Sequence, residues 1–187
     1  MGVMNSLEEL KSIYADASEW LKFLEAKHAG LFAVWTAALI AMFSTEQFYD
    51  ISIFLQGVMV AVVCGGLLID LIALAPFLNQ RERIKNKLQK ATYEKYKMYD
   101  ENAVFYITVF SKTYNTNTDY RAESVRRYKD ILLQRGFQDL DTQLYIDYMM
   151  QIIDVSTVGS IKAYLFNLAT KYSVIVMVVG IVGMVIA

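Results

Sequence analysis

The chain has 187 residues, of which 56% are hydrophobic, with one proline, one cysteine and a formal net charge of −1. This composition excludes an intrinsically disordered chain, a collagen-like repeat and a disulfide scaffold, since a single cysteine forms no intramolecular bridge. Eighteen Lys and Arg against nineteen Asp and Glu give no overall bias toward nucleic acid, and a mean hydropathy of +0.31 is high for a soluble domain. The distribution of these charges along the chain is therefore more informative than their sum.

The first predicted element is an amphipathic helix over residues 1–27 that continues into a membrane span. Its apolar side chains recur every three or four residues, at Leu7, Leu10, Tyr14, Ala17, Leu21, Leu24, His28 and Leu31. No proline or glycine interrupts the pattern between Ser6 and Gly30. We expect one long helix whose polar half lies outside the membrane.

Three stretches are long and apolar enough to cross a bilayer. Residues 28–45 and 51–69 are runs of eighteen and nineteen residues without a formal charge, and residues 172–187 form a third run of sixteen. At about 1.5 Å per residue the first two approach the roughly 30 Å of a bilayer core. The third suffices if Lys171 extends its amine to the interface. We expect a two-span hairpin over residues 28–79 and a C-terminal span over residues 172–187.

The positions of the basic residues predict the orientation of these spans. All eighteen Lys and Arg lie in residues 1–27 or 80–171, whereas the loop between the first two spans has two acids and no base. Because basic segments stay in the cytoplasm, we expect a cytoplasmic N-terminus and a C-terminus on the far, periplasmic or extracellular, side of the membrane.

Residues 80–171 are predicted to form a cytoplasmic helical sensor and assembly domain. A helix is favoured over 81–112, although 103–110 has the β-branched composition of a strand, and a second helix is expected from 120 to 135, ending at Gly136. A third begins near Asp141 and continues toward the last span. The expected fold is an all-α membrane protein with three transmembrane helices and a cytoplasmic helical domain formed largely by their extensions.

Small residues in the second span predict close helix packing. Gly57, Ala61 and Gly65 form a small-xxx-small ladder that lets helix backbones approach in lipid. Three spans alone make a thin bundle, so we expect a homo-oligomer, with a tetramer as one form. Packing within one subunit is the alternative.

The sequence contains no constellation of catalytic or metal-binding residues. It lacks a phosphate-binding loop, an HExxH motif and a CxxC motif, and it has one histidine. We therefore expect neither an enzyme nor a cofactor. His28 is interpreted as an interfacial residue at the cytoplasmic edge of the first span, with a pH-sensitive gate as the alternative.

Asp70 is the leading candidate for a pore-lining residue. A carboxylate within a span is costly unless it faces water, a partner or a pore, and a ring of Asp70 side chains would favour cations. An acid that reaches the interface or pairs with N–H groups is the alternative. Gln56 and Thr36 are weaker pore-lining candidates.

A group of basic and aromatic residues in the 80–171 segment is a candidate phosphate or nucleotide site. Fifteen Lys and Arg against eleven Asp and Glu give this segment a net charge of +4. Arginine and lysine bind phosphates, and tyrosine rings stack on bases. The candidates are Lys112, Arg121, Arg126, Arg127, Tyr128 and Lys129. Residues 139–154 contain four acids and no base, so pairing of the basic helix with this neighbour is one alternative. For the tyrosines, packing in a core or an interface with the hydroxyl in water is the other alternative.

The junction LKFLEAKHAGLFAVWTAALIA resembles the point where Pycsar-type effectors of bacterial anti-phage defence enter the membrane. An acid-x-Lys pair precedes a run of small and apolar residues there, and Glu25 and Lys27 match it, with Glu in place of the expected Asp. The channel effector of Hailong-type systems is a related resemblance.

This resemblance implies an effector that forms an oligomeric, nucleotide- or oligonucleotide-gated pore and causes abortive infection. Its expected partners are the lipid bilayer, further copies of the chain, a cyclic nucleotide or short oligonucleotide, and a nucleotidyltransferase or cyclase encoded nearby. The alternative is a membrane scaffold that conducts nothing and recruits a soluble partner through its cytoplasmic helices.

Overall fold

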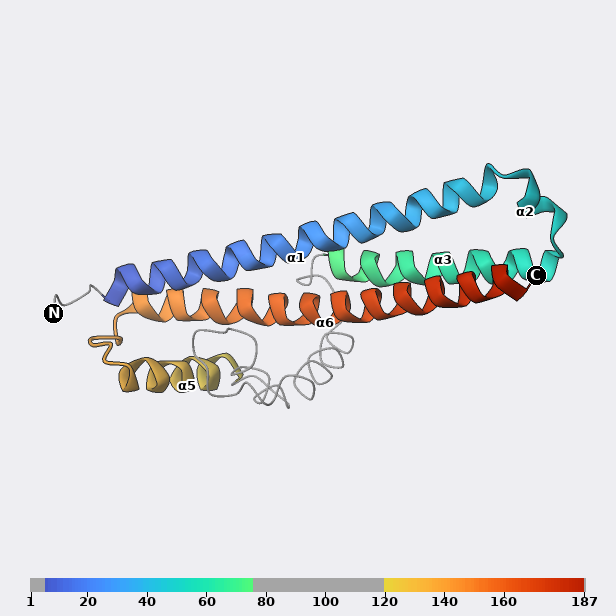
Figure 1. Cartoon of the computed structure of the whole chain (residues 1–187). Coiled ribbons are helices and arrows are strands. Elements are labelled where there is room, and N and C mark those ends of the chain that lie inside the picture. Colours follow the sequence, from blue (N-terminus) through green and yellow to red (C-terminus); the bar gives the residue numbers. More distant parts are fainter. Residues whose placement is uncertain (1–5, 76–119, 187) are drawn as a thin grey trace. The chain divides into compact units, whose positions relative to one another are not determined.

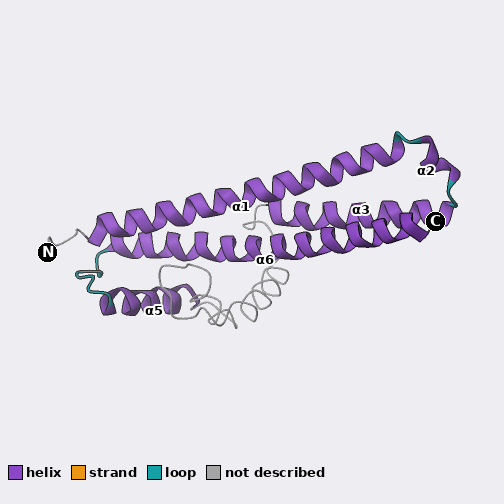
Figure 2. Ribbon diagram, viewed as in Figure 1, coloured by secondary structure: helices purple, strands orange, loops and turns teal. Residues whose placement is uncertain are grey.

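The computed structural model describes residues 6–75 and 120–186, and every regular element in these two ranges is a helix (Figures 1 and 2). The helices are α1 (Ser6–Phe43), α2 (Glu46–Asp50), α3 (Ile53–Leu74), α5 (Tyr120–Gln134) and α6 (Gln143–Ile186). The prediction of an all-α protein is confirmed. The predicted helix over 81–112, and the choice of helix or strand over 103–110, lie outside the described residues.

Three of the helices are long and apolar enough to span a membrane. The candidate spans are Leu7–Phe43, Ile53–Leu74 and Gln143–Val178. The 22 residues of α3 rise by about 33 Å, close to the thickness of a bilayer core. The sequence also predicted correctly that the N-terminal amphipathic pattern and the first span form one helix, and that the helix starting near Asp141 continues into the last span.

The chain divides into two compact units. The head unit comprises residues 1–23 and 76–162, and the span unit comprises residues 24–75 and 163–187. Both α1 and α6 contribute residues to both units. The four segments expected from the sequence, 1–27, 28–79, 80–171 and 172–187, follow charge and hydropathy instead, so their boundaries remain a prediction.

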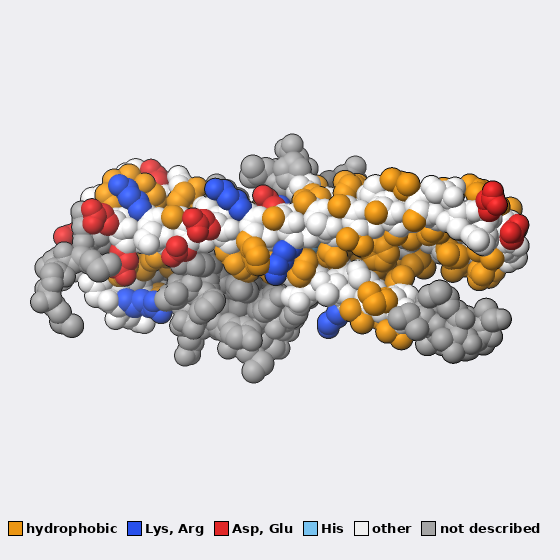
Figure 3. All heavy atoms as spheres, turned by 45° about the horizontal axis from the view of Figure 1, so that its top comes forward, with side chains coloured by type: hydrophobic (Ala, Val, Ile, Leu, Met, Phe, Trp, Pro, Cys, Tyr) orange, Lys and Arg blue, Asp and Glu red, His pale blue; other side chains and the backbone are white. Residues whose placement is uncertain are grey.

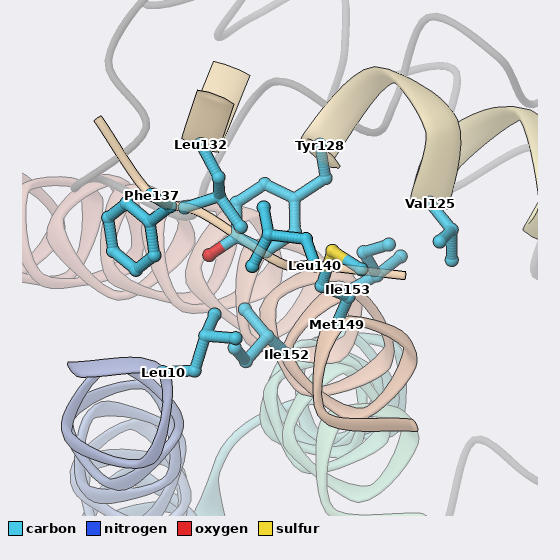
Figure 4. Packing of buried hydrophobic residues seen from close by; sticks show 9 residues of the cluster. All are labelled: Leu10, Val125, Tyr128, Leu132, Phe137, Leu140, Met149, Ile152 and Ile153. Carbon is cyan, nitrogen blue, oxygen red and sulfur yellow. The ribbon is translucent and has the colours of Figure 1, made fainter. Parts of the chain in front are cut away.

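The head unit has a hydrophobic core built from α5, α6 and the start of α1. Buried side chains from these helices and from the loop after α5 meet in one cluster (Figure 4). Its members are Leu10, Val125, Tyr128, Leu132, Phe137, Leu140, Met149, Ile152 and Ile153. Burial of this apolar surface holds α5 against α6 and thereby fixes the direction of its basic face.

The C-terminus of α5 is the one that the sequence predicted. Gly136 has a φ of 91°, a left-handed conformation that costs glycine nothing. The N–H of Phe137 donates to the carbonyl of Leu132 over 3.1 Å, and the N–H of Gly136 donates to that of Leu133 over 3.0 Å. This is the Schellman pattern, and the buried side chains of Phe137 and Leu132 add its hydrophobic contact.

The α3 helix is bounded by local sequence signals. The Ser52 side chain caps its first turn by accepting from the N–H of Leu55. At the other end, Ala75 has an extended backbone with φ −61° and ψ 138°, as expected for a residue that precedes proline. The span therefore runs without interruption from the hairpin to the residue before Pro76.

The described surface of the span unit is apolar. Ile53 and Phe54 are 86% and 78% exposed, and hydrophobic side chains gather on the visible face of this unit (Figure 3). Only 11% of the most apolar stretch of the first candidate span is buried, and only 22% of the corresponding stretch of α3 is buried. Apolar surface on this scale requires lipid or another protein surface as its surroundings.

Candidate functional site

His28 and Asp70 form a buried polar pair inside the span unit. His28 Nδ1 lies 2.7 Å from Asp70 Oδ1, and both side chains have no exposed surface. The second carboxylate oxygen, Oδ2, is buried without a hydrogen-bond partner among the described residues. The pair joins α1 to α3, and it combines the only histidine of the chain with the only acid inside α3.

The third helix of the unit completes the surroundings of this pair. The ring of Phe166 on α6 lies edge-on to the His28 ring, with the ring centroids 5.6 Å apart. The amine of Lys27 lies 5.0 Å from the centroid of the same Phe166 ring. This is a cation–π contact. The three long helices of the unit, α1, α3 and α6, therefore all contribute to the layer that contains His28 and Asp70.

This pair was not predicted from the sequence. His28 was interpreted as an interfacial residue, but its side chain is completely buried. The two partners are 42 positions apart in the sequence, so no local sequence pattern indicates their contact. Depth along the hairpin would have revealed it: His28 and Asp70 lie about 22 and 26 Å from the hairpin ends of their helices, at nearly the same level.

The three candidate pore-lining residues have different surroundings within one chain. Asp70 packs against His28 as described, and the hydroxyl of Thr36 donates to the carbonyl of Phe32 over 2.8 Å. The amide of Gln56 donates to the carbonyl of Ile51 over 3.0 Å and so supports the hairpin turn. Pore lining requires several chains, and this assignment remains a prediction.

Two tightly packed glycines on α3 accept aromatic rings from the neighbouring helices. The Trp35 ring occupies the space where a side chain on Gly66 would lie. A Cβ on Gly65 would lie 2.8 Å from the Tyr172 hydroxyl, which donates to the carbonyl of Val62 over 2.7 Å. Gly65 therefore packs within the subunit, which was the alternative in the sequence analysis.

The other two members of the predicted small-xxx-small ladder have different surroundings. Gly57 has nothing within 4 Å of an added Cβ, and Ala61 is exposed on the same helix. This part of α3 is therefore accessible to another helix or to lipid. A role for Gly57 and Ala61 in contacts between subunits stays a prediction.

The candidate phosphate site on α5 has a mixed character. Arg126 is exposed and Arg127 half-buried, whereas the Tyr128 ring lies in the head-unit core. Lys129 pairs with Asp141, so the pairing with the acidic neighbour that we considered is present for this residue. The side chain of Arg121 and the whole of Lys112 lie outside the described part of the chain.

The described residues contain no cluster of three or more His, Cys, Asp or Glu side chains with the spacing of a metal site.

A comparison with protein families identifies the family to which this chain is similar. The model of the Pycsar effector protein domain, PycTM, matches residues 9–187, which is nearly the whole chain. No curated protein and no solved structure matches the chain significantly.

Proposed function

The chain belongs to the Pycsar effector family, and from this premise we propose that it assembles into a nucleotide-gated pore in the bacterial inner membrane. Pycsar effectors are membrane effectors of anti-phage defence, and they respond to cyclic nucleotides made by a cyclase. Opening of the pore would dissipate ion gradients and stop growth before phage replication is complete, which is the expected outcome of abortive infection.

The observation that carries this proposal is the combination of a family match over residues 9–187 with three long apolar helices. The apolar outer surface of the span unit supports association of several chains, because three helices alone enclose no channel wide enough for hydrated ions.

The basic face of α5 is the proposed sensor. Arg126 and Arg127 are adjacent, belong to a helix anchored by its apolar face, and present guanidinium groups suited to phosphate. A nucleotide that binds more tightly to one state of the head unit would shift the protein toward that state. A cyclic mononucleotide is the ligand class of the family, and a short oligonucleotide is the second class that the sequence suggested.

The proposal places residues 80–171 and the N-terminus in the cytoplasm, where the signal is made. Support comes from the charge pattern: the hairpin between α1 and α3 carries Glu46 and Asp50 and no base. The C-terminus would then lie in the periplasm.

Ion flux from liposomes tests the proposal and its sensor together. Purified protein is reconstituted with a trapped fluorescent dye and exposed to cyclic mononucleotides of the four bases and to short DNA oligonucleotides. We expect one ligand class to change the flux. The Arg126→Ala/Arg127→Ala variant should need at least about tenfold more ligand, because a hydrogen bond to a charged group contributes about 1.5–3 kcal/mol.

The matched control removes the same charge elsewhere. Lys11→Ala/Lys22→Ala replaces two exposed bases on α1 and should respond like the wild type. Protein that conducts under none of these conditions supports the non-conducting scaffold instead. An equal loss of response in both double variants would attribute the effect to general charge and reject the α5 sensor.

A further inference from the structure

We propose that His28 and Asp70 form a proton-binding site inside the span unit, and that the number of protons bound there sets how tightly α1, α3 and α6 pack. The ligand is a proton, which hydronium transfers to the pair and thereby becomes water, so the effector would have a second input beside its nucleotide. The inference rests on the proposed function only where ion flux is the readout.

The site has the geometry of a shared proton. The two side chains are within hydrogen-bond distance, at 2.7 Å, and both are fully buried. Asp70 Oδ2 is a buried acceptor without a partner among the described residues, so a further proton can bind there without displacing an existing hydrogen bond of that atom. Ionisable residues within spans commonly belong to proton relays or ion pathways.

Counting protons gives the expected behaviour. Imidazolium with carboxylate is neutral overall, and this state satisfies the hydrogen bond. Loss of one proton to water leaves neutral imidazole beside a carboxylate, with a net charge of −1. Addition of one proton gives imidazolium beside a carboxylic acid, with a net charge of +1. Because a net charge buried in apolar surroundings is costly, the packed unit is most stable in the neutral state.

Side chains from all three long helices lie around this pair in the described part of the chain. From α6 the side chain in contact with His28 is Phe166, which does not titrate. On α1 the neighbouring Lys27 is directed to that same ring, and on α3 the acid is Asp70 itself. The hydroxyl of Tyr172 on α6 donates to the carbonyl of Val62, two helical turns from Asp70.

The single histidine makes the site directly observable. With ¹⁵N-labelled histidine, the full-length protein in nanodiscs gives imidazole signals from His28 alone. The signals are followed from pH 4 to pH 10 together with the thermal unfolding midpoint. We expect both to change over the same pH intervals, with a stability maximum between them. One linked proton changes the ratio of packed to loosened unit by up to about tenfold per pH unit.

Two substitutions with nearly unchanged shape separate the two limbs of the pH profile. Asp70→Asn keeps an acceptor for His28 but removes the carboxylate charge, so the site is neutral only while the imidazole is neutral. Protonation of His28 then leaves a net buried charge, and stability should fall only as pH decreases. His28→Asn leaves a single acid, so stability should fall only as pH increases. The exchanged variant His28→Asp/Asp70→His should restore the maximum, and Cys64→Ser on α3 should behave like the wild type.

Three results would overturn the proposal. The first is a pH-dependent imidazole signal that Asp70→Asn leaves unchanged, and the second is the same pH profile of stability in the wild type and both single variants. The third is an exchanged variant whose stability has no maximum between the two pH intervals. If a single variant fails to fold, the wild-type titration and the exchanged variant still decide the matter. Dye flux at different pH values adds the functional arm. Absence of flux at every pH, with the imidazole and stability results as expected, would reject the pore but keep the proton site.

Discussion

The buried contact between His28 and Asp70 shows how one polar pair constrains three membrane helices. Neither side chain has exposed surface, so each needs the other to offset the loss of water. Phe166 closes the layer from α6. A polar pair among apolar side chains also specifies register, since a shift of one residue along either helix would separate the two partners.

Removing one partner of the pair should destabilise the span unit more than removing both. His28→Leu or Asp70→Leu leaves a single buried polar group, at a cost of about 3–5 kcal/mol in the free energy of unfolding. The double variant His28→Leu/Asp70→Leu should lose less than either single variant, because it leaves no unpaired polar group buried. Unfolding by SDS in mixed micelles measures this cycle. Additive losses would show that the two side chains do not interact.

The glycines of α3 provide a comparison on a single helix. In Gly66→Ala the new methyl group would overlap the Trp35 ring, and we expect a loss of about 1–3 kcal/mol in the free energy of unfolding. Gly57→Ala adds a methyl group in open space and should be neutral or stabilising, by up to about 1 kcal/mol. The same unfolding assay compares them. Equal effects of the two substitutions would contradict the packing described.

For single residues, the sequence indicated which side chains were unusual but not which side chains they contact. Asp70 was recognised as a costly carboxylate, and its partner was missed because helical periodicity carries no information on contacts between helices. Tyr128 was proposed to stack on a base, yet its ring fills the head-unit core. Its spacing from Val125 and Leu132 places all three on one face of α5, a signal that was available.

At the scale of single elements, α5 depends on the match between its apolar face and its C-terminal cap. Leu132 serves both, because its carbonyl accepts the hydrogen bond from Phe137 and its side chain lies in the core. The basic residues Arg126 and Lys129 lie outside that face. Packing of the apolar face therefore holds the proposed sensor in place.

Two adjacent leucines of α5 should respond very differently to truncation. Leu132 is 1% exposed and Leu133 is 45% exposed. Leu132→Ala should cost about 2–5 kcal/mol in the free energy of unfolding, because it opens a cavity in the core. Leu133→Ala should cost less than about 1 kcal/mol. The thermal unfolding midpoint of the full-length protein distinguishes the two, and similar shifts for both would argue against the core in Figure 4.

The long helices were predictable because their apolar periodicity repeats over many residues. The short helix α2 was not predictable, because five residues contain no such repeat. The apolar periodicity, the absence of proline and the glycine at 136 identified α1, α5 and α6. The five-residue helix α2 was treated as part of a loop. It forms because Phe48 is buried and packs against Phe43, with ring centroids 5.5 Å apart, and such a tertiary contact has no local signature.

At the scale of the whole molecule, charge and hydropathy divide the chain into parts that face different solvents. The span unit exposes apolar side chains, and the Lys and Arg residues lie outside the uncharged stretches of its helices. The number of spans followed from the sequence because it depends only on length and composition. The number of subunits did not follow, because one chain contains no information on the geometry of its copies.

The position of the C-terminus is a direct consequence of three spans. With a cytoplasmic N-terminus, a tag after Ala187 should lie in the periplasm. Alkaline phosphatase fused there should be active, and a fluorescent protein that folds only in the cytoplasm should stay dark. A control fusion after Arg135, in the head unit, should give the reverse result. The opposite pattern at Ala187 would contradict the proposed topology.

Gating of a pore by a nucleotide can be measured as current through a planar lipid bilayer. Purified full-length protein is inserted, and cyclic mononucleotides are added first to one side and then to the other. We expect discrete current steps whose open probability changes when one nucleotide reaches the side that carries the head unit. A bilayer that stays silent with every nucleotide on both sides, from protein shown to be folded and inserted, would contradict the proposed gating.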